Sequence, residues 1–197
     1  MAQWAPQKSD TLDALATEIL HNYGRGRAII AIDGPVGSGT SDFAAGLAAA
    51  IERTSHAAFV ASIEDFHRDP ASVEPEFDEA AFSRSDYDYS LLRRILLDPF
   101  KNPGHGGFVL AGYDRARRSP IEPKWMTAPV DAVLIVEGVF LNRPELRGLW
   151  SYSVWLDSRG LRSPDEYYNE SKPRTTATAI VNNSDPEHPR RNFADSC

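Results

Sequence analysis

The sequence predicts an α/β fold in which parallel strands form the core sheet, and three observations lead to this prediction. Residues 27–33 and 57–63 are runs of β-branched and small apolar residues with almost no polar positions, as in strands that are buried on both faces. Residues 132–136 form the most hydrophobic run in the chain. Helical periodicity appears between or before these runs, at residues 10–23 and 41–53. Strands that alternate with helices indicate parallel pairing through helical crossovers.

A glycine-rich turn, GPVGSGTS, follows the first of these strands and leads into a helix. Its glycines are Gly34, Gly37 and Gly39, and it has the spacing of the phosphate-binding loop G-x-x-x-x-G-K-[ST], except that Thr40 occupies the lysine position. Backbone N–H groups and the helix N-terminus bind phosphate in such a loop, and neither requires the lysine. Ser41 keeps the hydroxyl expected to bind Mg²⁺. A plain connection in an α/β domain has similar composition, so the loop alone leaves both interpretations open.

Two of the predicted strands lead directly into a carboxylate. The strand at 57–63 is followed by Glu64 in the polar cluster EDFHR, and the strand at 132–136 ends in Glu137. An apolar strand that ends in one carboxylate resembles the Walker B arrangement, in which the carboxylate reaches Mg²⁺ directly or through water. A buried Glu without a metal would be costly. For the cluster at Glu64, a solvated acidic turn is the alternative.

The middle of the chain is predicted to form a loop, a helix and a small flap. Residues 69–85 have no clear periodicity and are expected as a loop, whereas residues 87–100 have a helical apolar face that Pro99 should end. A short strand at 108–113 then opens a hairpin-bearing flap that extends to residue 121. The flap is either a source of cations for an anionic substrate or a solvated basic turn, and its arginines are Arg115, Arg117 and Arg118.

Two more strands are expected near the C-terminus, at residues 152–156 and 175–181. The final residues, 182–197, are polar and contain several prolines, so we expect them to run over the surface. No internal repeat is visible in the sequence.

Length and composition limit the classes of protein to consider. The chain has 197 residues, enough for one α/β domain, and we expect residues 1–197 to form a single domain. A formal net charge of -7 argues against a general nucleic-acid binder. The single cysteine, Cys197, excludes an internal disulfide, and no stretch is long and apolar enough for a membrane span, so we expect a cytoplasmic protein. The sequence leaves a homo-oligomer open.

Six segments that cover most of the chain carry a family resemblance. As they stand in the sequence, they are IAIDGPVGSGTS, ASIEDFHR, SDYDYSLLRRILLDP, AGYDRARRSP, DAVLIVEGVFLNRPELRGLWSYSVWLD and ATAIVNNSDPEHPRR. Together they resemble the uridine kinase branch of the P-loop kinases, in particular the uridine kinase-like proteins of high-GC bacteria. The resemblance implies a three-layer P-loop NTPase fold with a parallel core sheet and a small substrate-binding flap. It also implies that ATP and Mg²⁺ serve to phosphorylate a small-molecule hydroxyl, that of a nucleoside such as uridine or cytidine.

The resemblance also implies roles for individual positions. Glu64 takes the place of the catalytic Asp that accepts the proton of the attacking hydroxyl, and Glu137 takes the Walker B role, with Ser41 as the second protein group at Mg²⁺. The phosphates of ATP would be bound by Gly34, Gly37, Ser38, Gly39, Thr40 and Ser41. The adenine would be bordered by Asn182, Asn183 and Pro186. The nucleoside pocket would be lined by Asp86, Tyr87, Tyr113 and Arg118.

The sequence departs from the family in three places. Thr40 replaces the lysine of the loop, and Glu64 replaces Asp. The arginine-bearing lid that follows the Walker B region is missing or much shortened between Leu156 and Tyr168. The candidate cations for the transferred phosphoryl group are then Arg115, Arg117, Arg118 and Arg162.

Two alternatives follow from these departures. One is a catalytically impaired, nucleotide-binding pseudokinase with a regulatory or binding role. The other is a kinase of a non-nucleoside substrate, such as pantothenate or a sugar.

Overall fold

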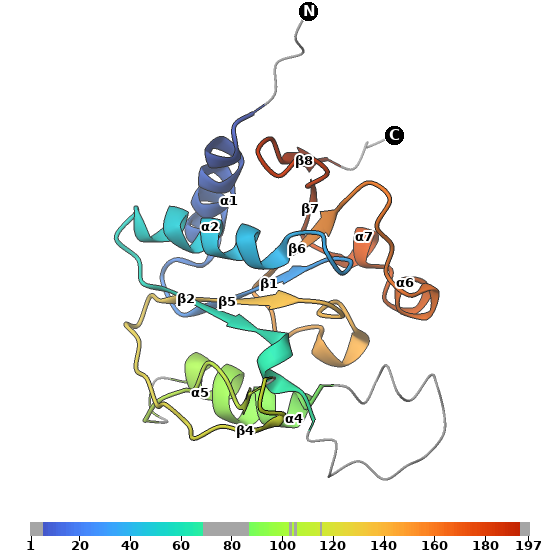
Figure 1. The fold of residues 1–197 in the computed structure, drawn as a ribbon. Helices are drawn as coiled ribbons and strands as arrows, with labels where there is room; N and C mark the ends of the chain where they lie inside the picture. The colour runs from blue at the N-terminus through green and yellow to red at the C-terminus, as the bar shows by residue number, and fades with distance from the viewer. Residues whose placement is uncertain (1–5, 69–86, 103, 105, 115, 194–197) are drawn as a thin grey trace, which may run out of the picture. The chain divides into compact units, whose positions relative to one another are not determined.

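The computed structural model describes residues 6–68, 87–102, 104, 106–114 and 116–193 (Figure 1). The predicted loop at 69–85, Asp86 and Arg115 lie outside the described residues. The chain divides into two compact units, Met1–Val60 with Pro129–Cys197 (unit 1) and Ala61–Ala128 (unit 2). The expectation of a single domain stays a prediction. No helix among the described residues is both long and apolar enough to cross a membrane.

A six-stranded sheet has the strand order β2-β5-β1-β6-β7-β8 (Figure 1). Its strands are β1 (Ala28–Asp33), β2 (Ala58–Ser62), β5 (Val133–Gly138), β6 (Tyr152–Asp157), β7 (Ala179–Asn182) and β8 (Arg190–Asn192). The central strand β1 pairs in parallel with both β5 and β6, and β6 pairs in parallel with β7. Every residue of β1 and β5 is buried, as the apolar runs predicted. The predicted α/β fold with a mainly parallel core sheet is therefore confirmed.

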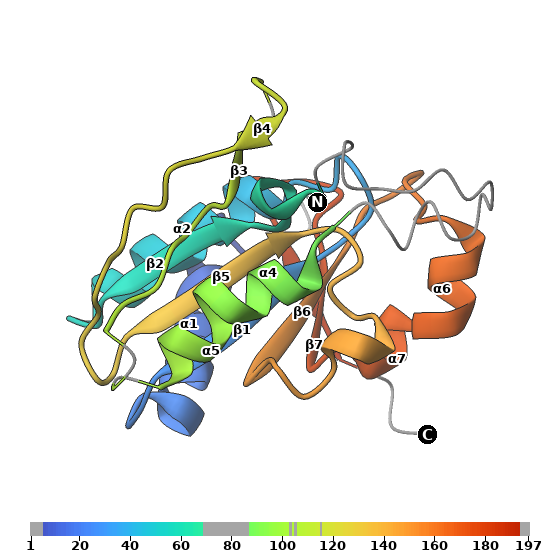
Figure 2. The same ribbon diagram turned by 90° about the horizontal axis from the view of Figure 1, so that it is seen from below.

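Two helices of unit 1, α1 (Lys8–Tyr23) and α2 (Thr40–Glu52), lie on the same face of this sheet (Figures 1 and 2). The N-terminus of α1 has a capping box in which the N–H of Gln7 donates to the Asp10 carboxylate at 2.9 Å. Both helices bury apolar side chains against the sheet, and Ile19 and Leu47 are completely buried there. Burial of such a side chain contributes roughly 1.5–3 kcal/mol, so this layer anchors α2, whose N-terminus carries the glycine-rich loop.

The C-terminal part of unit 1 differs from the prediction in two places. The predicted strand at 175–181 is wrong at its start, because residues 175 and 176 belong to α7 (Pro173–Thr176) and β7 begins only at Ala179. Lys172 has a left-handed φ of 46°, which ends α6 (Asp165–Ser171), and proline is favourable at the start of the next helix. The predicted surface tail contains β8, which pairs antiparallel with β7. Its sequence, RRN, has no apolar pattern that would indicate a strand.

Unit 2 contains short helical segments and a hairpin. They are η1 (Ile63–Phe66), α4 (Tyr89–Leu92), the π-helical η3 (Arg93–Leu97), α5 (Asp98–Lys101), β3 (Tyr113–Asp114) and β4 (Ser119–Pro120). The predicted end of the helix at Pro99 is wrong, because the helical path continues to Lys101. Pro99 lies in the first two positions of α5, directly after the wide π turn, where its missing N–H costs little.

The predicted flap forms its hairpin, since β3 and β4 pair antiparallel. The predicted strand at 108–113 is wrong, however, because β3 includes only the last of these residues. The N–H of Val109 donates to the carbonyl of Ile95 at 2.8 Å, and the N–H of Gly112 donates to the carbonyl of Asp65 at 3.0 Å. These backbone groups bond to helical segments and are not available to a sheet partner.

Candidate functional site

The glycine-rich loop between β1 and α2 has the backbone conformation that a phosphate-binding loop needs. Gly37 and Gly39 have φ of 83° and 86°, in the left-handed region where glycine is strongly favoured. Gly39 is also the N-cap of α2, so the loop ends at the positive end of the helix dipole. Thr40, at the lysine position, is the first residue of α2 and is half-buried.

Most backbone donors of this loop are unused. The N–H of Ser38 donates to the Pro35 carbonyl at 3.0 Å and closes a turn. The loop donors that have no hydrogen-bond acceptor among the described residues are the N–H groups of Val36, Gly37, Gly39, Thr40 and Ser41. Backbone N–H groups at a helix N-terminus require water, a side chain or a ligand as acceptor. The loop is therefore a candidate anion site.

Asn183, predicted beside the adenine, contacts this loop. It follows β7, it is buried, and its side-chain amide donates to the carbonyl of Ser38 at 2.8 Å. A Cβ atom added to Gly39 would lie 3.0 Å from the same amide nitrogen, so the Asn183 side chain lies directly over the loop. Pro186 is exposed further along the same connection.

Glu137 and Ser41, the predicted Mg²⁺ ligands, both belong to unit 1. Glu137 pairs with Ile32 across β5 and β1 and is 5 % exposed. The carbonyl of the next residue, Gly138, accepts the N–H of Gly34 at 3.3 Å, so Glu137 lies at the strand end where the loop begins. Ser41 is exposed in the first turn of α2. In the described part of the chain, no group of three or more His, Cys, Asp or Glu residues could hold a metal, so Mg²⁺ here would need phosphate oxygens and water as further ligands.

Asp33 is a buried carboxyl group beside the loop that the sequence analysis did not select. It is the last residue of β1, and its Oδ2 accepts hydrogen bonds from the Asn142 N–H at 2.9 Å and the Asn142 amide at 2.7 Å. The hydroxyl of Tyr167 on α6 donates to the same oxygen. Burial raises the pKa of Asp33 to about 6, although these hydrogen bonds act in the opposite direction. The signal for it in the sequence is an acidic residue at the end of an apolar strand, directly before the first glycine.

A pocket of about 340 Å³ opens beside the loop, within unit 1. Its lining includes Pro35, Trp155, Asp157, Leu161, Arg162 and Arg174. Arg174 donates to the Asp157 carboxylate at 2.7 Å, and Arg162 is exposed. The pocket lies where residues 158–164 connect β6 to α6, the region in which the resemblance implies a missing or shortened lid. It brings guanidinium groups close to a loop that lacks its lysine.

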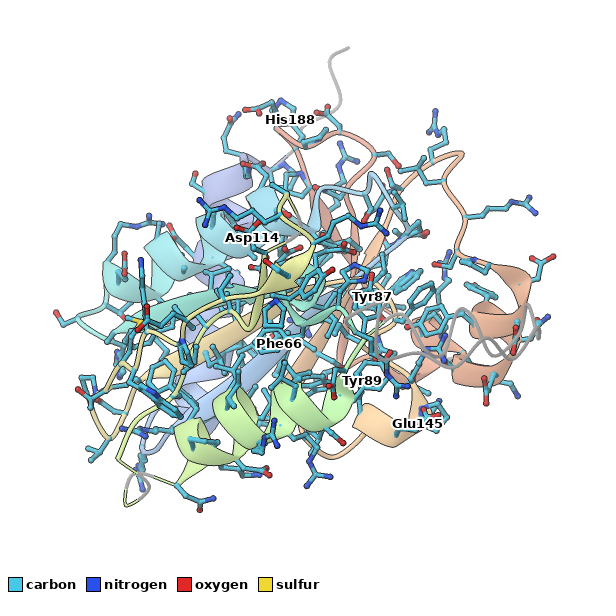
Figure 3. All side chains as sticks on the ribbon, turned by 60° about the horizontal axis from the view of Figure 1, so that its bottom comes forward. Phe66, Tyr87, Tyr89, Asp114, Glu145 and His188 are labelled. Carbon is cyan, nitrogen blue, oxygen red and sulfur yellow. The ribbon has the colours of Figure 1, made fainter. Side chains whose placement is uncertain are left out.

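In unit 2, Glu64 lies on η1 with 26 % of its side chain exposed. The Tyr87 hydroxyl donates to its Oε1 at 2.6 Å, and His67 Nε2 lies 3.2 Å from its Oε2. A backbone bridge joins residues 67 and 87, and the segments that carry Phe66 and Tyr87 can be followed in Figure 3. The predicted general base and a predicted substrate residue are thus in direct contact. His67 was not among the predicted site residues, although its position three residues after Glu64 could have indicated the contact.

The two side chains that contact the Glu64 carboxylate belong to a cluster of aromatic rings. The His67 ring centroid is 4.7 Å from that of Tyr87 and 6.3 Å from that of Tyr113, and Tyr89 lies 6.4 Å from Tyr87. Tyr113 is buried, and its ring joins this cluster through His67. Arg118 has a left-handed φ of 52° in the hairpin turn and is exposed. Asp86 lies outside the described residues.

No protein-family model and no curated protein sequence matches the chain. Solved structures do match. A possible uridine kinase from Bacillus stearothermophilus is similar with a TM-score of 0.72 and 23% identity, over 87% of this chain and 97% of that chain. A proposed fructose transport system kinase from Silicibacter sp. TM1040 is similar with a TM-score of 0.60 and 27% identity, over 74% of each chain.

The chain has the fold of the P-loop kinases. The three-layer fold class predicted from the sequence is confirmed, because both similar structures are P-loop kinase-like and the core sheet of this chain is mainly parallel. The resemblance to uridine kinase-like proteins is confirmed at the level of the fold, since the similar structures include a possible uridine kinase.

Proposed function

We propose that this protein is an ATP- and Mg²⁺-dependent kinase that transfers a phosphoryl group to a hydroxyl of a nucleoside. The observation that carries the proposal is the set of N–H groups in the loop between β1 and α2 that have no acceptor within the described part of the chain. Such donors, at the positive end of a 13-residue helix, suit the phosphate oxygens of a nucleotide. The cofactor-binding residues are those of the loop together with Asn183 and Pro186.

The residues of unit 1 fit a Mg²⁺–nucleotide complex. Ser41 offers a hydroxyl in the first turn of α2, and Glu137 offers a carboxylate at the end of β5. Both are oxygen ligands, which Mg²⁺ prefers, and a buried carboxylate gains from a nearby cation. When bound, ATP with Mg²⁺ supplies the phosphoryl group and neutralises part of its charge.

Glu64 is the proposed general base. Its carboxylate accepts the proton of the substrate hydroxyl while the hydroxyl oxygen forms its bond to phosphorus and the bond from phosphorus to ADP breaks. A Glu is one methylene longer than the Asp of the family, so orientation matters: a misplacement of about 1 Å is expensive. The hydroxyl of Tyr87 donates to one oxygen of this carboxylate at 2.6 Å and so contributes to that orientation.

The aromatic cluster favours a nucleoside as acceptor. Rings such as Tyr87 and Tyr113 can stack on a planar base, whereas a free sugar has no π face. We assign substrate contacts to Asp86, Tyr87, Tyr113 and Arg118. The proposed fructose transport system kinase among the similar structures makes a sugar the competing acceptor.

Arg162 and Arg174 are the cations that we assign to the phosphoryl group in place of the lysine. They line the pocket that includes Pro35 of the loop. A guanidinium can bind two phosphate oxygens at once, and a transferring phosphoryl group needs such charge stabilisation.

An acceptor screen tests the proposal. The protein is incubated with ATP, Mg²⁺ and, separately, uridine, cytidine, other nucleosides, fructose and pantothenate, and ADP release is followed. We expect turnover with a pyrimidine nucleoside and at least a hundredfold loss in Glu64→Gln, since general bases contribute roughly 10²–10⁴-fold. Turnover with fructose or pantothenate alone would establish the alternative, a kinase of a non-nucleoside substrate. Nucleotide binding without turnover on any acceptor would establish the pseudokinase.

A further inference from the structure

We propose that His67 is a positioning residue for the Glu64 carboxylate, acting as a hydrogen-bond donor together with Tyr87. This inference rests on the proposed function, because it concerns the general base of that reaction. It adds to it a residue for which neither the family resemblance nor the sequence pattern assigned a role.

The geometry places one donor on each carboxylate oxygen. Tyr87 Oη donates to Oε1 at 2.6 Å, and His67 Nε2 lies 3.2 Å from Oε2. A carboxylate has about four lone-pair positions, and these two bonds use one position on each oxygen. Two bonds at different oxygens fix the rotation of the carboxylate plane, which a single bond does not.

The contact also defines the hydrogen position on the imidazole. An ionised carboxylate is only an acceptor, so Nε2 must carry a hydrogen. The neutral tautomer with hydrogen on Nε2 and the imidazolium both satisfy this, whereas the other neutral tautomer would set two lone pairs against each other. His67 is therefore a hydrogen-bond donor to Glu64 and does not receive the substrate proton at Nε2.

The surrounding backbone holds His67 and Tyr87 in place. Residues 67 and 87 form an antiparallel bridge, and the N–H of Asp88 donates to the carbonyl of Phe66 at 2.7 Å. The His67 ring contacts the rings of Tyr87 and Tyr113. The ring is thus located by packing that does not depend on Glu64, and it can impose an orientation on the carboxylate.

Glu64 has particular need of such a donor. Its side chain has one more rotatable bond than Asp, and the terminal torsion of a Glu has a broad, weakly preferred range. The bond at Oε2 restricts rotation of the carboxylate about the bond from Tyr87. The donors therefore compensate for the longer side chain at this position.

Three variants separate the donor from the ring. His67→Phe keeps a ring that can pack on Tyr87 and Tyr113 but removes the donor, and His67→Gln restores an N–H donor. We expect His67→Phe to lower kcat by roughly 10- to 100-fold with little change in the KM for ATP, and His67→Gln to recover most of that loss. His56→Phe, in unit 1, is the matched control and should leave kcat unchanged. Circular dichroism establishes that each variant is folded.

A second background tests whether His67 acts through Glu64. In Glu64→Asp the carboxylate is drawn back by one methylene and loses its contact with His67. His67→Phe should then cost less than twofold in addition, so the two substitutions should be strongly non-additive. Full additivity of the two losses would overturn the proposal.

A spectroscopic readout does not require turnover. Long-range ¹H–¹⁵N spectra report the nitrogen resonances of each histidine, and we expect Glu64→Gln to move the Nε2 resonance of His67 but not that of His56. An unmoved His67 resonance would overturn the proposal whatever the kinetics show. The proposal would also be overturned if the wild type is active and His67→Phe has the same kcat. If the wild type turns over no acceptor, the proposed function is overturned instead. The spectra could then still detect the contact between His67 and Glu64, but that contact would have no role in catalysis.

Discussion

Asn183 donates its side-chain amide to the carbonyl of Ser38 at 2.8 Å, and so joins the connection after β7 to the glycine-rich loop after β1. Both residues are buried and they lie 145 positions apart in the sequence. The bond uses a carbonyl of the loop and leaves the N–H groups of Gly39 and Thr40 available to an anion. Asn183 therefore supports the shape of the loop.

The first prediction tests this support. Asn183→Asp replaces the donor with an acceptor that repels the Ser38 carbonyl and adds negative charge beside the proposed phosphate site. We expect the affinity for ADP with Mg²⁺ to fall about tenfold or more, since a lost buried hydrogen bond costs roughly 1–3 kcal/mol. Isothermal titration measures it. Asn192→Asp, on β8, is the control, and equal affinities for the two variants would contradict the assignment.

The second prediction concerns the buried carboxyl of Asp33. Its pKa is raised from 3.8 to about 6 by burial, so the folded protein binds a proton more tightly than the unfolded chain does between these values. The contribution of Asp33 to the free energy of unfolding should therefore be highest below about pH 4. It should fall as the pH rises to about 6, by about 3 kcal/mol in total.

Asp33→Asn isolates this dependence. The amide keeps an oxygen that can accept the hydrogen bonds from Asn142 and Tyr167 but does not titrate. Urea unfolding at several pH values should show that wild type loses stability relative to Asp33→Asn between pH 4 and 6. The pair Glu18–Arg191 is common to both proteins and cancels in the difference. Asp165→Asn, at an exposed carboxylate, is the control, and a constant difference between wild type and Asp33→Asn would show that Asp33 does not titrate in this range.

The third prediction tests Glu137 as a Mg²⁺ ligand. We expect Glu137→Gln to lose most of the gain in ADP affinity that Mg²⁺ confers on the wild type, because a neutral amide binds the ion more weakly. Without metal, the variant should be at least as stable as the wild type, since a buried carboxylate is costly and the amide is not charged. Titrations with Mg²⁺ and with a chelator measure the first effect, and thermal unfolding measures the second. Glu145→Gln, at the exposed residue labelled in Figure 3, should change neither.

The parts of the fold that the sequence predicts are those with a strong local pattern. The apolar runs of β1 and β5 and the periodic face of α1 each determine an element without help from distant residues. β8 escaped prediction because its pairing with β7 is a backbone interaction between segments whose side chains follow no pattern. The strand expected at 108–113 failed because its backbone bonds to η1 and η3, partners that no local pattern identifies.

The candidate site divides in the same way. The loop from Gly34 to Ser41 is a continuous motif, so spacing alone indicates it. The contact between Glu64 and Tyr87 joins residues 23 positions apart, and it requires the bridge at His67. Asp33 is missed because an acidic residue in a strand is usually exposed, and only the converging donors of Asn142 and Tyr167 explain its burial.

The last prediction addresses the missing lysine. We expect Thr40→Lys to raise both ATP affinity and the rate of ADP release, because an ammonium group near the β- and γ-phosphates stabilises charge that shifts during transfer. An effect of a few kcal/mol corresponds to about a hundredfold in rate. Thr40 is half-buried at the start of α2, so a longer side chain itself could disturb packing. Thr40→Met is the matched control, because methionine is similar in length to lysine but has no charge. The ratio of the rates of the Lys and Met variants therefore measures the effect of the ammonium group alone.

The outcomes of this comparison are distinct. A large Lys-to-Met ratio for both affinity and turnover indicates that the phosphates lack a cation in the wild type. If the wild type is active and the Lys-to-Met ratio of turnover rates is near one, Arg162 or Arg174 already supplies the charge. In that case Arg162→Gln should reduce turnover strongly in the wild type and much less in the Thr40→Lys variant. A gain in affinity with no turnover identifies a pseudokinase. If neither variant differs from the wild type in affinity or turnover, position 40 does not face the phosphates, and the assignment of the loop between β1 and α2 as the nucleotide site is wrong.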